Sequence, residues 1–114
     1  MTDYENEVIF CIVNEGFSDA VMEAARRAGA RGGTVIRSHG LANAEAEKMF
    51  GITISPQKEI VMMLVERACR DAILHALYTS MGLDSPGQGI AFSLPVDGVA
   101  GLAKPEKTKE KTGD

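Results

Sequence analysis

The sequence predicts an α+β fold in which one antiparallel sheet carries two helices on one of its faces. The first observation is the order of the elements, because strand-like, helix-like and strand-like segments follow one another and then repeat. The second is that each helix-like segment ends at a glycine and is followed by a glycine-containing loop and a strand. Right-handed strand–helix–strand passages of this kind pack as a split-βαβ, ferredoxin-like sandwich.

The first half of the chain supplies one strand–helix–strand unit. Val8–Val13 is a continuous apolar run rich in β-branched residues, which is typical of a strand. Ser18 is placed to cap the helix that follows, and Gly29 is placed to end it. Thr34–Ile36 then predicts a second strand that leads outward to His39.

The second half repeats the plan. Glu59–Val65 predicts the third strand, and an amphipathic helix follows it and ends at Gly82. Ile90–Leu94 predicts a fourth strand closed by Pro95, and Val99 predicts a short fifth extended piece. Because one layer of helices covers only one face of the sheet, apolar residues on the other face predict self-association.

Length and charge limit the organisation and the partners. The chain has 114 residues, which fits a single domain over residues 1–102, and the polar stretch 103–114 predicts a disordered tail. The sequence holds 12 basic and 16 acidic residues. A protein that binds a phosphate backbone needs a basic stripe, and none is visible. We therefore expect no nucleic-acid partner.

The chain carries no recognisable signal for export or for the membrane. Its first residues, Met1 to Glu5, are acidic where a secretory leader is basic. The longest uncharged apolar run, Val8–Val13, is too short to span a bilayer. Cys11 and Cys69 lie far apart within apolar segments, which is typical of reduced thiols in a core. We expect a cytoplasmic protein with no direct membrane insertion.

The segment 39–57, between the second and third strands, is longer than a connection between two strands needs. It is not of low complexity, and it contains several apolar side chains. Two interpretations remain open: a locally folded excursion that packs on its own subunit, or a loop that binds a partner protein. The residues that would contact such a partner are Leu41, Met49, Phe50 and Ile52.

Gly87, Gln88 and Gly89 form a glycine-containing loop before the fourth strand. In the dinucleotide-binding fingerprint the glycines follow a strand and open a helix, so this loop is not that motif. Its N–H groups suit an anion-binding nest, and a plain tight turn is the alternative. The residues alone leave both interpretations open.

The polar residues form no recognisable catalytic or metal site. His39 stands at a strand–loop junction and His75 on the polar side of a helix, and neither has a second ligand at metal-binding spacing. No serine lies in a nucleophile elbow. Glu45 and Glu47 are neighbours in a stretch typical of a solvated face. We expect no catalytic residue and no metal.

Four stretches of the chain carry a resemblance to a known family. They are residues 29–36 (GARGGTVI), 58–61 (KEIV), 86–96 (PGQGIAFSLPV) and 99–102 (VAGL). Through them, and over the range 8–102, the chain resembles the P-II nitrogen-regulatory signalling superfamily. It is more similar to the divergent P-II-like group than to the nitrogen sensors themselves.

The resemblance implies a homotrimer that binds an adenine nucleotide in the clefts between subunits and has no catalytic activity. It also implies that the ligand adjusts the 39–57 loop, which docks on a transporter or a metabolic enzyme in nitrogen or related metabolism. The implied ligand-binding residues are Gly33, Thr34, Arg37, Ser38, His39 and Gly40 on one side, and Leu64, Gly87, Gln88 and Gly89 on the other.

The chain departs from the family pattern at several positions. The loop has no tyrosine to accept a nucleotidyl group, Ile90 replaces a basic residue, and Gly101 and Ala103 replace two arginines. These cations neutralise a triphosphate, so their absence favours ADP or AMP over ATP. The basic residues left to compensate are Arg37, His39 and Lys58.

Three hypotheses follow from these features. The leading one is a P-II-like regulator that senses a small ligand. The second is an interaction or scaffold protein of the same fold that has lost nucleotide binding, which the missing cations favour. The third is a small enzyme, which is disfavoured because no activated nucleophile or base is visible.

Overall fold

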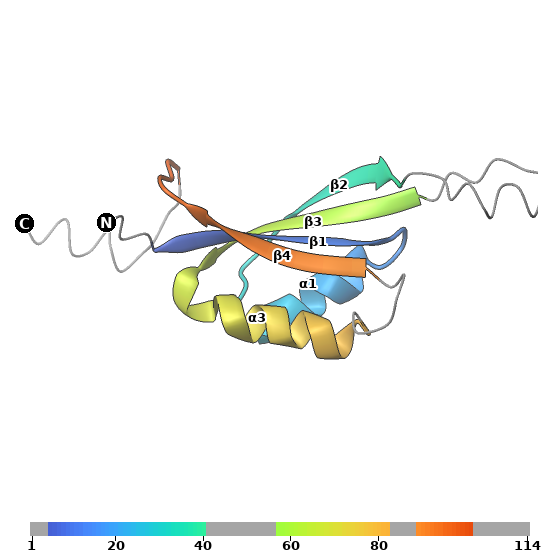
Figure 1. The fold of residues 1–114 in the computed structure, drawn as a ribbon, viewed down its shortest axis with the longest axis horizontal. Coiled ribbons are helices and arrows are strands. Elements are labelled where there is room, and N and C mark those ends of the chain that lie inside the picture. The colour runs from blue at the N-terminus through green and yellow to red at the C-terminus, as the bar shows by residue number, and fades with distance from the viewer. Residues whose placement is uncertain (1–4, 41–56, 83–88, 102–114) are drawn as a thin grey trace, which may run out of the picture.

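The computed structural model describes residues 5–40, 57–82 and 89–101. Its elements are β1 (Asn6–Asn14), α1 (Ser18–Arg27), β2 (Thr34–His39), β3 (Gln57–Glu66), α3 (Arg67–Ser80) and β4 (Gly89–Val96). The strands form one sheet in the order β2-β3-β1-β4, and all neighbours are antiparallel. Both helices lie on the same face of this sheet (Figure 1). The predicted α+β, ferredoxin-like fold is confirmed.

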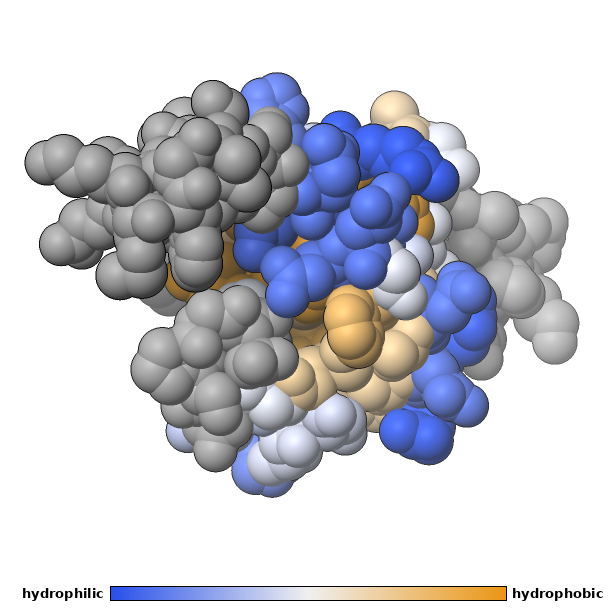
Figure 2. Space-filling model, turned by 90° about the vertical axis from the view of Figure 1, so that its right-hand side faces the viewer, coloured by the Kyte–Doolittle hydropathy of each residue, from blue (hydrophilic) through white to orange (hydrophobic). Residues whose placement is uncertain are grey.

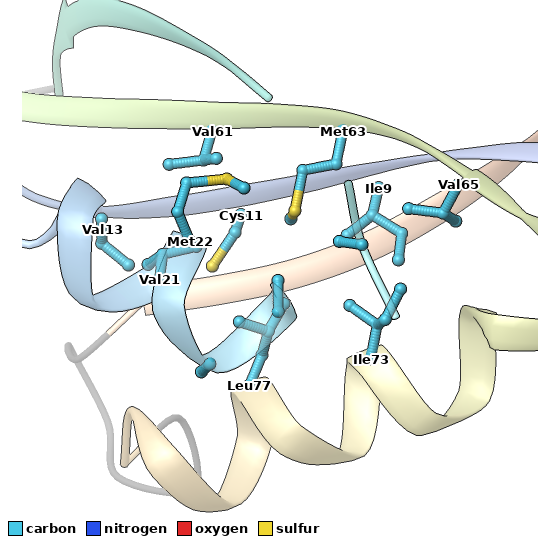
Figure 3. Packing of buried hydrophobic residues seen from close by; sticks show 13 residues of the cluster. Ile9, Cys11, Val13, Val21, Met22, Val61, Met63, Val65, Ile73 and Leu77 are labelled. Atoms are coloured by element: carbon cyan, nitrogen blue, oxygen red, sulfur yellow. The ribbon is translucent and has the colours of Figure 1, made fainter. Parts of the chain in front are cut away.

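The core lies between the sheet and the helices. Alternate side chains of a strand point to opposite faces, and those of β1 and β3 that face the helices are buried. They meet Val21 and Met22 of α1 and Ile73 and Leu77 of α3 (Figure 3). Complete burial of one such large aliphatic side chain stabilises the fold by about 1.5–3 kcal/mol. The contributing strand residues are Ile9, Cys11, Val13, Val61, Met63 and Val65.

The start of α1 differs from the prediction that Ser18 caps it. Phe17 occupies the N-cap position, Ser18 is the first helical residue, and no side chain of the cap residue bonds the helix. Instead, Oε1 of Glu59 on β3 accepts hydrogen bonds from the backbone N–H groups of Gly16 and Ser18, each at 3.2 Å. A carboxylate from the sheet thus takes the place of a local cap, and its negative charge suits the positive end of the helix.

The end of the sheet at β4 also differs from the prediction. Pro95 does not close the strand but lies inside it, paired in register with Glu7. Proline is tolerated there because β4 is an edge strand, where one row of N–H groups needs no partner. Val99 lies outside every strand of the sheet, so the expected fifth extended piece is not part of it.

The face of the sheet opposite the helices is apolar, and no helix or strand of the described residues covers it (Figure 1). Paired residues of antiparallel strands share a face, and on this one the register pairs nine apolar side chains of β1, β3 and β4 with one another. Phe10 and Phe92 stack there with ring centroids 5.5 Å apart. Ile90, Phe92 and Leu94 are 55%, 40% and 50% exposed. We call this set the open-face cluster: Val8, Phe10, Ile12, Ile60, Met62, Leu64, Ile90, Phe92 and Leu94.

The two thiols have different environments. Cys11 is fully buried in the core, and burial raises the pKa of its thiol to about 11. Cys69 is only partly buried and packs at the border of the core, and neither cysteine forms a disulfide. The expectation of a core thiol therefore holds fully for Cys11.

The predicted tail, residues 103–114, lies outside the described residues, and so does the end of the predicted domain at residue 102. Neither helix in the described part of the chain combines the length and the apolar character that a membrane span requires.

Candidate functional site

The site begins at one end of the sheet, where β1 and β2 end and β3 and β4 begin (Figure 1). We call it the loop end and define it by residues 14–18, 37–40, 57–59 and Gly89. The register places Arg37, Glu59, Val13 and Gly89 in one row across the four strands. The structure thus brings five of the predicted ligand-binding residues to the same end: Arg37, Ser38, His39, Gly40 and Gly89.

Three other predicted ligand-binding residues lie away from the loop end, Gly33 and Thr34 near the middle of the sheet and Leu64 closer to its far end. Thr34 pairs with Met62, Gly33 precedes it, and Leu64 pairs with Val8. Leu64 is five positions along β3 from Glu59, which corresponds to about 17 Å of strand. One chain therefore does not bring the two sets together.

Gly33 has a packing role within its own chain. A Cβ at this position would lie 2.9 Å from Sδ of Met22 and 3.1 Å from the carbonyl oxygen of Met62. The second of these contacts is with backbone, which has little room to move. Gly33 lets the start of β2 approach the core closely, whether or not it meets a ligand.

The remaining predicted residues lie outside the described part of the chain. These are Gly87 and Gln88 of the glycine-containing loop, and Leu41, Met49, Phe50 and Ile52 of the partner-binding loop. Their predicted roles stay predictions.

Two basic side chains at the loop end are held by polar neighbours. Nη1 of Arg37 lies 3.4 Å from Oε2 of Glu15, and both side chains are largely exposed, at 79% and 52%. Such an exposed pair contributes little to stability. Nζ of Lys58 donates a 2.7 Å hydrogen bond to Oδ1 of Asn14. Among the described residues no carboxylate lies within ion-pair distance of Lys58.

Glu59 is the residue at the loop end that sequence reasoning missed. It is only 7% exposed, and its carboxylate serves the turn before α1. The signal was present in the strand pattern, because Glu59 has the same parity as the buried residues Val61, Met63 and Val65. An acid at an inward position of an apolar strand needs partners, since a buried charge without them is costly.

Two hollows lie near this end of the molecule. One holds about 190 Å³ and is lined by Val13, Asn14, Phe17, Ala20, Ser80 and Met81. The other holds about 400 Å³ between α3 and β4 and is lined by Leu74, His75, Tyr78, Gly89, Ile90 and Ala91. Figure 2 looks at the loop end and shows hydrophilic residues gathered beside a hydrophobic area. Among the predicted ligand-binding residues that the structure describes, only Gly89 lines either hollow.

The described residues contain no group of three or more histidine, cysteine or acidic side chains arranged to hold a metal ion. His75 is exposed, and its carbonyl oxygen accepts a 3.0 Å hydrogen bond from the hydroxyl of Thr79. The loop end offers hydrogen bonding and two basic side chains, Arg37 and Lys58, beside the carboxylates of Glu15 and Glu59.

No protein-family model and no curated protein sequence matches the chain. Solved structures match it in fold. The nitrogen regulatory PII-like protein CPII of Thiomonas intermedia K12, bound to ADP, AMP and bicarbonate, aligns with a TM-score of 0.63 and 12% identity over 87% of this chain and 98% of that one.

Two further structures agree. The GlnK–ATP complex of B. subtilis gives a TM-score of 0.61 and 15% identity over 81% and 84% of the two chains. The citrate-bound PII protein of Arabidopsis thaliana gives a TM-score of 0.60 and 20% identity, and the alignment covers 83% of this chain and 78% of that one. At these identities the likeness shows a shared fold: the chain has the fold of PII-like proteins.

Proposed function

We propose that this chain is a divergent P-II-like signalling protein that binds an adenine nucleotide between subunits and regulates a partner protein through the 39–57 loop. The observation that carries the proposal is that the expected ligand-binding residues are spread along one sheet, some at the loop end and Leu64 about 17 Å away along β3, with an apolar face between them. A second copy of the chain, packed on the open-face cluster, supplies the half that each copy lacks. The likeness in fold to CPII and GlnK supports this arrangement.

The assembly we propose is a homotrimer. The open-face cluster is too apolar to stay in water, and closed symmetric assemblies are the usual way to cover such a surface. Three copies, as the family resemblance implies, pack their open faces toward a common centre. The loop end of one copy then lies beside Thr34 and Leu64 of its neighbour.

The ligand we propose is ADP or AMP in preference to ATP. Phosphates need cations or N–H donors, and the loop end of the described chain offers Arg37, Lys58 and the exposed His39. Ile90, where the family pattern has a basic residue, is apolar and belongs to the open-face cluster. The CPII structure holds ADP and AMP, whereas the GlnK structure holds ATP.

The protein acts by binding rather than by catalysis. Its partner is a transporter or an enzyme of nitrogen or related metabolism, and ligand occupancy changes the fit of the 39–57 loop to that partner. The proposed compartment is the cytoplasm, where thiols such as Cys11 and Cys69 stay reduced.

A second candidate function is an interaction or scaffold protein that has kept the assembly and lost the nucleotide. The replacement of basic residues by Ile90 and Gly101 favours it. The two candidates differ in one measurable property, which is affinity for nucleotides.

Titration calorimetry with AMP, ADP and ATP, each with and without Mg²⁺, tests the proposal. We expect ADP or AMP to bind at least as tightly as ATP. Tight binding of ATP without metal, clearly stronger than that of ADP, would show that the remaining cations suffice for a triphosphate. No binding of any nucleotide would favour the scaffold.

A further inference from the structure

The turn 14–18, which joins β1 to α1, is bonded along its length to the beginning of β3. The backbone N–H of Glu15 donates a 3.2 Å hydrogen bond to the carbonyl oxygen of Gln57. The next N–H groups, those of Gly16 and Ser18, both donate to the carboxylate of Glu59. The turn therefore rests on the strand that leaves the 39–57 loop.

The same turn holds both basic side chains of the loop end. Asn14, at its start, accepts the hydrogen bond from Lys58, and Glu15 pairs with Arg37. Each of these contacts is one hydrogen bond or one ion pair, and the pair between Arg37 and Glu15 is exposed. Neither contact alone holds the turn in place. The geometry of both cations depends on where the turn lies.

Glu59 is the buried member of this set of contacts. No ion pair of the described residues includes it, so its carboxylate is compensated by main-chain N–H groups and by the start of α1. Hydrogen bonds to an ionised acceptor are stronger than neutral ones. Removal of the carboxylate leaves two N–H groups in a partly buried place without their acceptor, which favours a different turn.

We infer that Glu59 is a positioning residue for the proposed ligand site: it holds the turn 14–18 in the conformation that directs Arg37 and Lys58 toward the ligand. Its effect passes through Glu15 and Asn14, and Glu59 itself does not touch the ligand. The expected effect on ligand affinity rests on the proposed function. The contacts of Glu59 with the turn do not depend on it.

The affinity test compares the variants Glu59→Ala and Glu59→Gln by calorimetry with ADP, at a temperature where both are folded. Glutamine keeps an acceptor oxygen at the same place, whereas alanine removes it. We expect ADP affinity to fall about tenfold in E59A, corresponding to one misplaced charge-assisted contact, and to stay within about threefold of wild type in E59Q. Glu66→Ala, at the far end of β3, is the control and leaves the affinity unchanged.

If Glu59 only stabilises the fold, the ADP affinity of the variants differs from this expectation. If E59A is folded and binds ADP as the wild type does, Glu59 only stabilises the fold and the inference is overturned. If E59A does not fold, Glu59→Leu replaces it, because leucine fills the buried position and offers no acceptor to the two N–H groups. Unchanged ADP affinity in E59L then overturns the inference, and weaker affinity supports it.

Hydrogen exchange measured by NMR without ligand separates this inference from the proposed function. We expect the N–H of Glu15 to exchange about tenfold faster in E59A together with those of Gly16 and Ser18, since the turn moves as a unit. The side-chain resonances of Arg37 and Lys58 shift with them. If only the N–H groups of Gly16 and Ser18 exchange faster, the inference is wrong, even if the wild type binds ADP. If the N–H of Glu15 also exchanges faster and the two side-chain resonances shift, but the wild type binds no nucleotide, then the proposed ligand is wrong and the positioning role stands.

Discussion

Replacement of Phe92 by glutamate tests whether the open-face cluster is an interface between copies. Phe92 is 40% exposed in the single chain. The accessible surface of a phenylalanine side chain is about 200 Å², so about 80 Å² of Phe92 is exposed in the single chain and would be buried in the trimer. At about 25 cal/mol per Å² this area contributes about 2 kcal/mol per chain, or about 6 kcal/mol in a trimer. A carboxylate at the same place also resists desolvation, so the loss of association free energy is at least this large.

A change of about 6 kcal/mol weakens assembly by about four orders of magnitude. Light scattering coupled to gel filtration at micromolar concentration is the assay, and we expect a trimer for the wild type and a folded monomer for F92E. The control is Tyr78→Glu, because Tyr78 is similarly exposed but lies on α3, which packs on the other face of the sheet (Figure 1). An F92E protein with the same mass as the wild type would refute the reasoning, as would a wild-type protein that is a monomer.

Three further predictions concern the stability of the fold. Leu77→Ala removes a fully buried side chain and should lower the free energy of unfolding by about 2–5 kcal/mol in urea denaturation, with no change in slope. Gly29→Ala should lower the melting temperature, because Gly29 has φ +123° and an added Cβ would lie 3.0 Å from Sγ of Cys69, whereas Gly32→Ala, with open space around it, should not. Burial raises the pKa of Cys11 from 9.0 to about 11, so the protonated thiol stabilises the fold fully below pH 9 and this contribution is lost as the pH rises toward 11; a Cys11→Ala variant lacks that part of the pH dependence.

The order of the elements could be predicted from the sequence because each strand and helix is marked locally. Val8–Val13 lies within β1, and the paired glycines before Thr34 precede β2. Which face of β1 and β3 is buried could not be predicted in the same way, because both strands are nearly continuous apolar runs and the alternation appears only in the burial of their side chains. What local pattern does not contain is the partner of a residue across the sheet.

The start of α1 shows this limit. Ser18 has the right type and place for a cap, but the donors that need an acceptor meet Glu59, more than forty residues away in the chain. Pro95 shows the same limit, because its effect depends on β4 being an edge strand. Both outcomes follow from tertiary pairing rather than from local preference.

Only part of the candidate site could be predicted from the sequence, because local pattern does not show which residues meet across the sheet or between copies. Adjacent residues such as Arg37 and His39 stay together in the structure, and the register adds Gly89 to them. Thr34, opposite the middle of β3, and Leu64, closer to the far end, lie away from the loop end, so their place in the proposed site depends on a second copy. A single sequence carries little information about contacts between copies.

Subunit complementation tests the central claim, that each ligand site is built from two chains. His39→Glu places a negative charge at the loop end, and Thr34→Glu places one in the set of predicted residues that the proposal takes from the neighbouring chain, so each variant alone should not bind ADP. After the two are mixed, unfolded together and refolded, random assembly in a symmetric ring restores about one quarter of the sites, each formed by the intact halves of two chains. Calorimetry should then give about one ADP per four chains with wild-type affinity. A mixture that binds no more ADP than the separate variants would contradict the account.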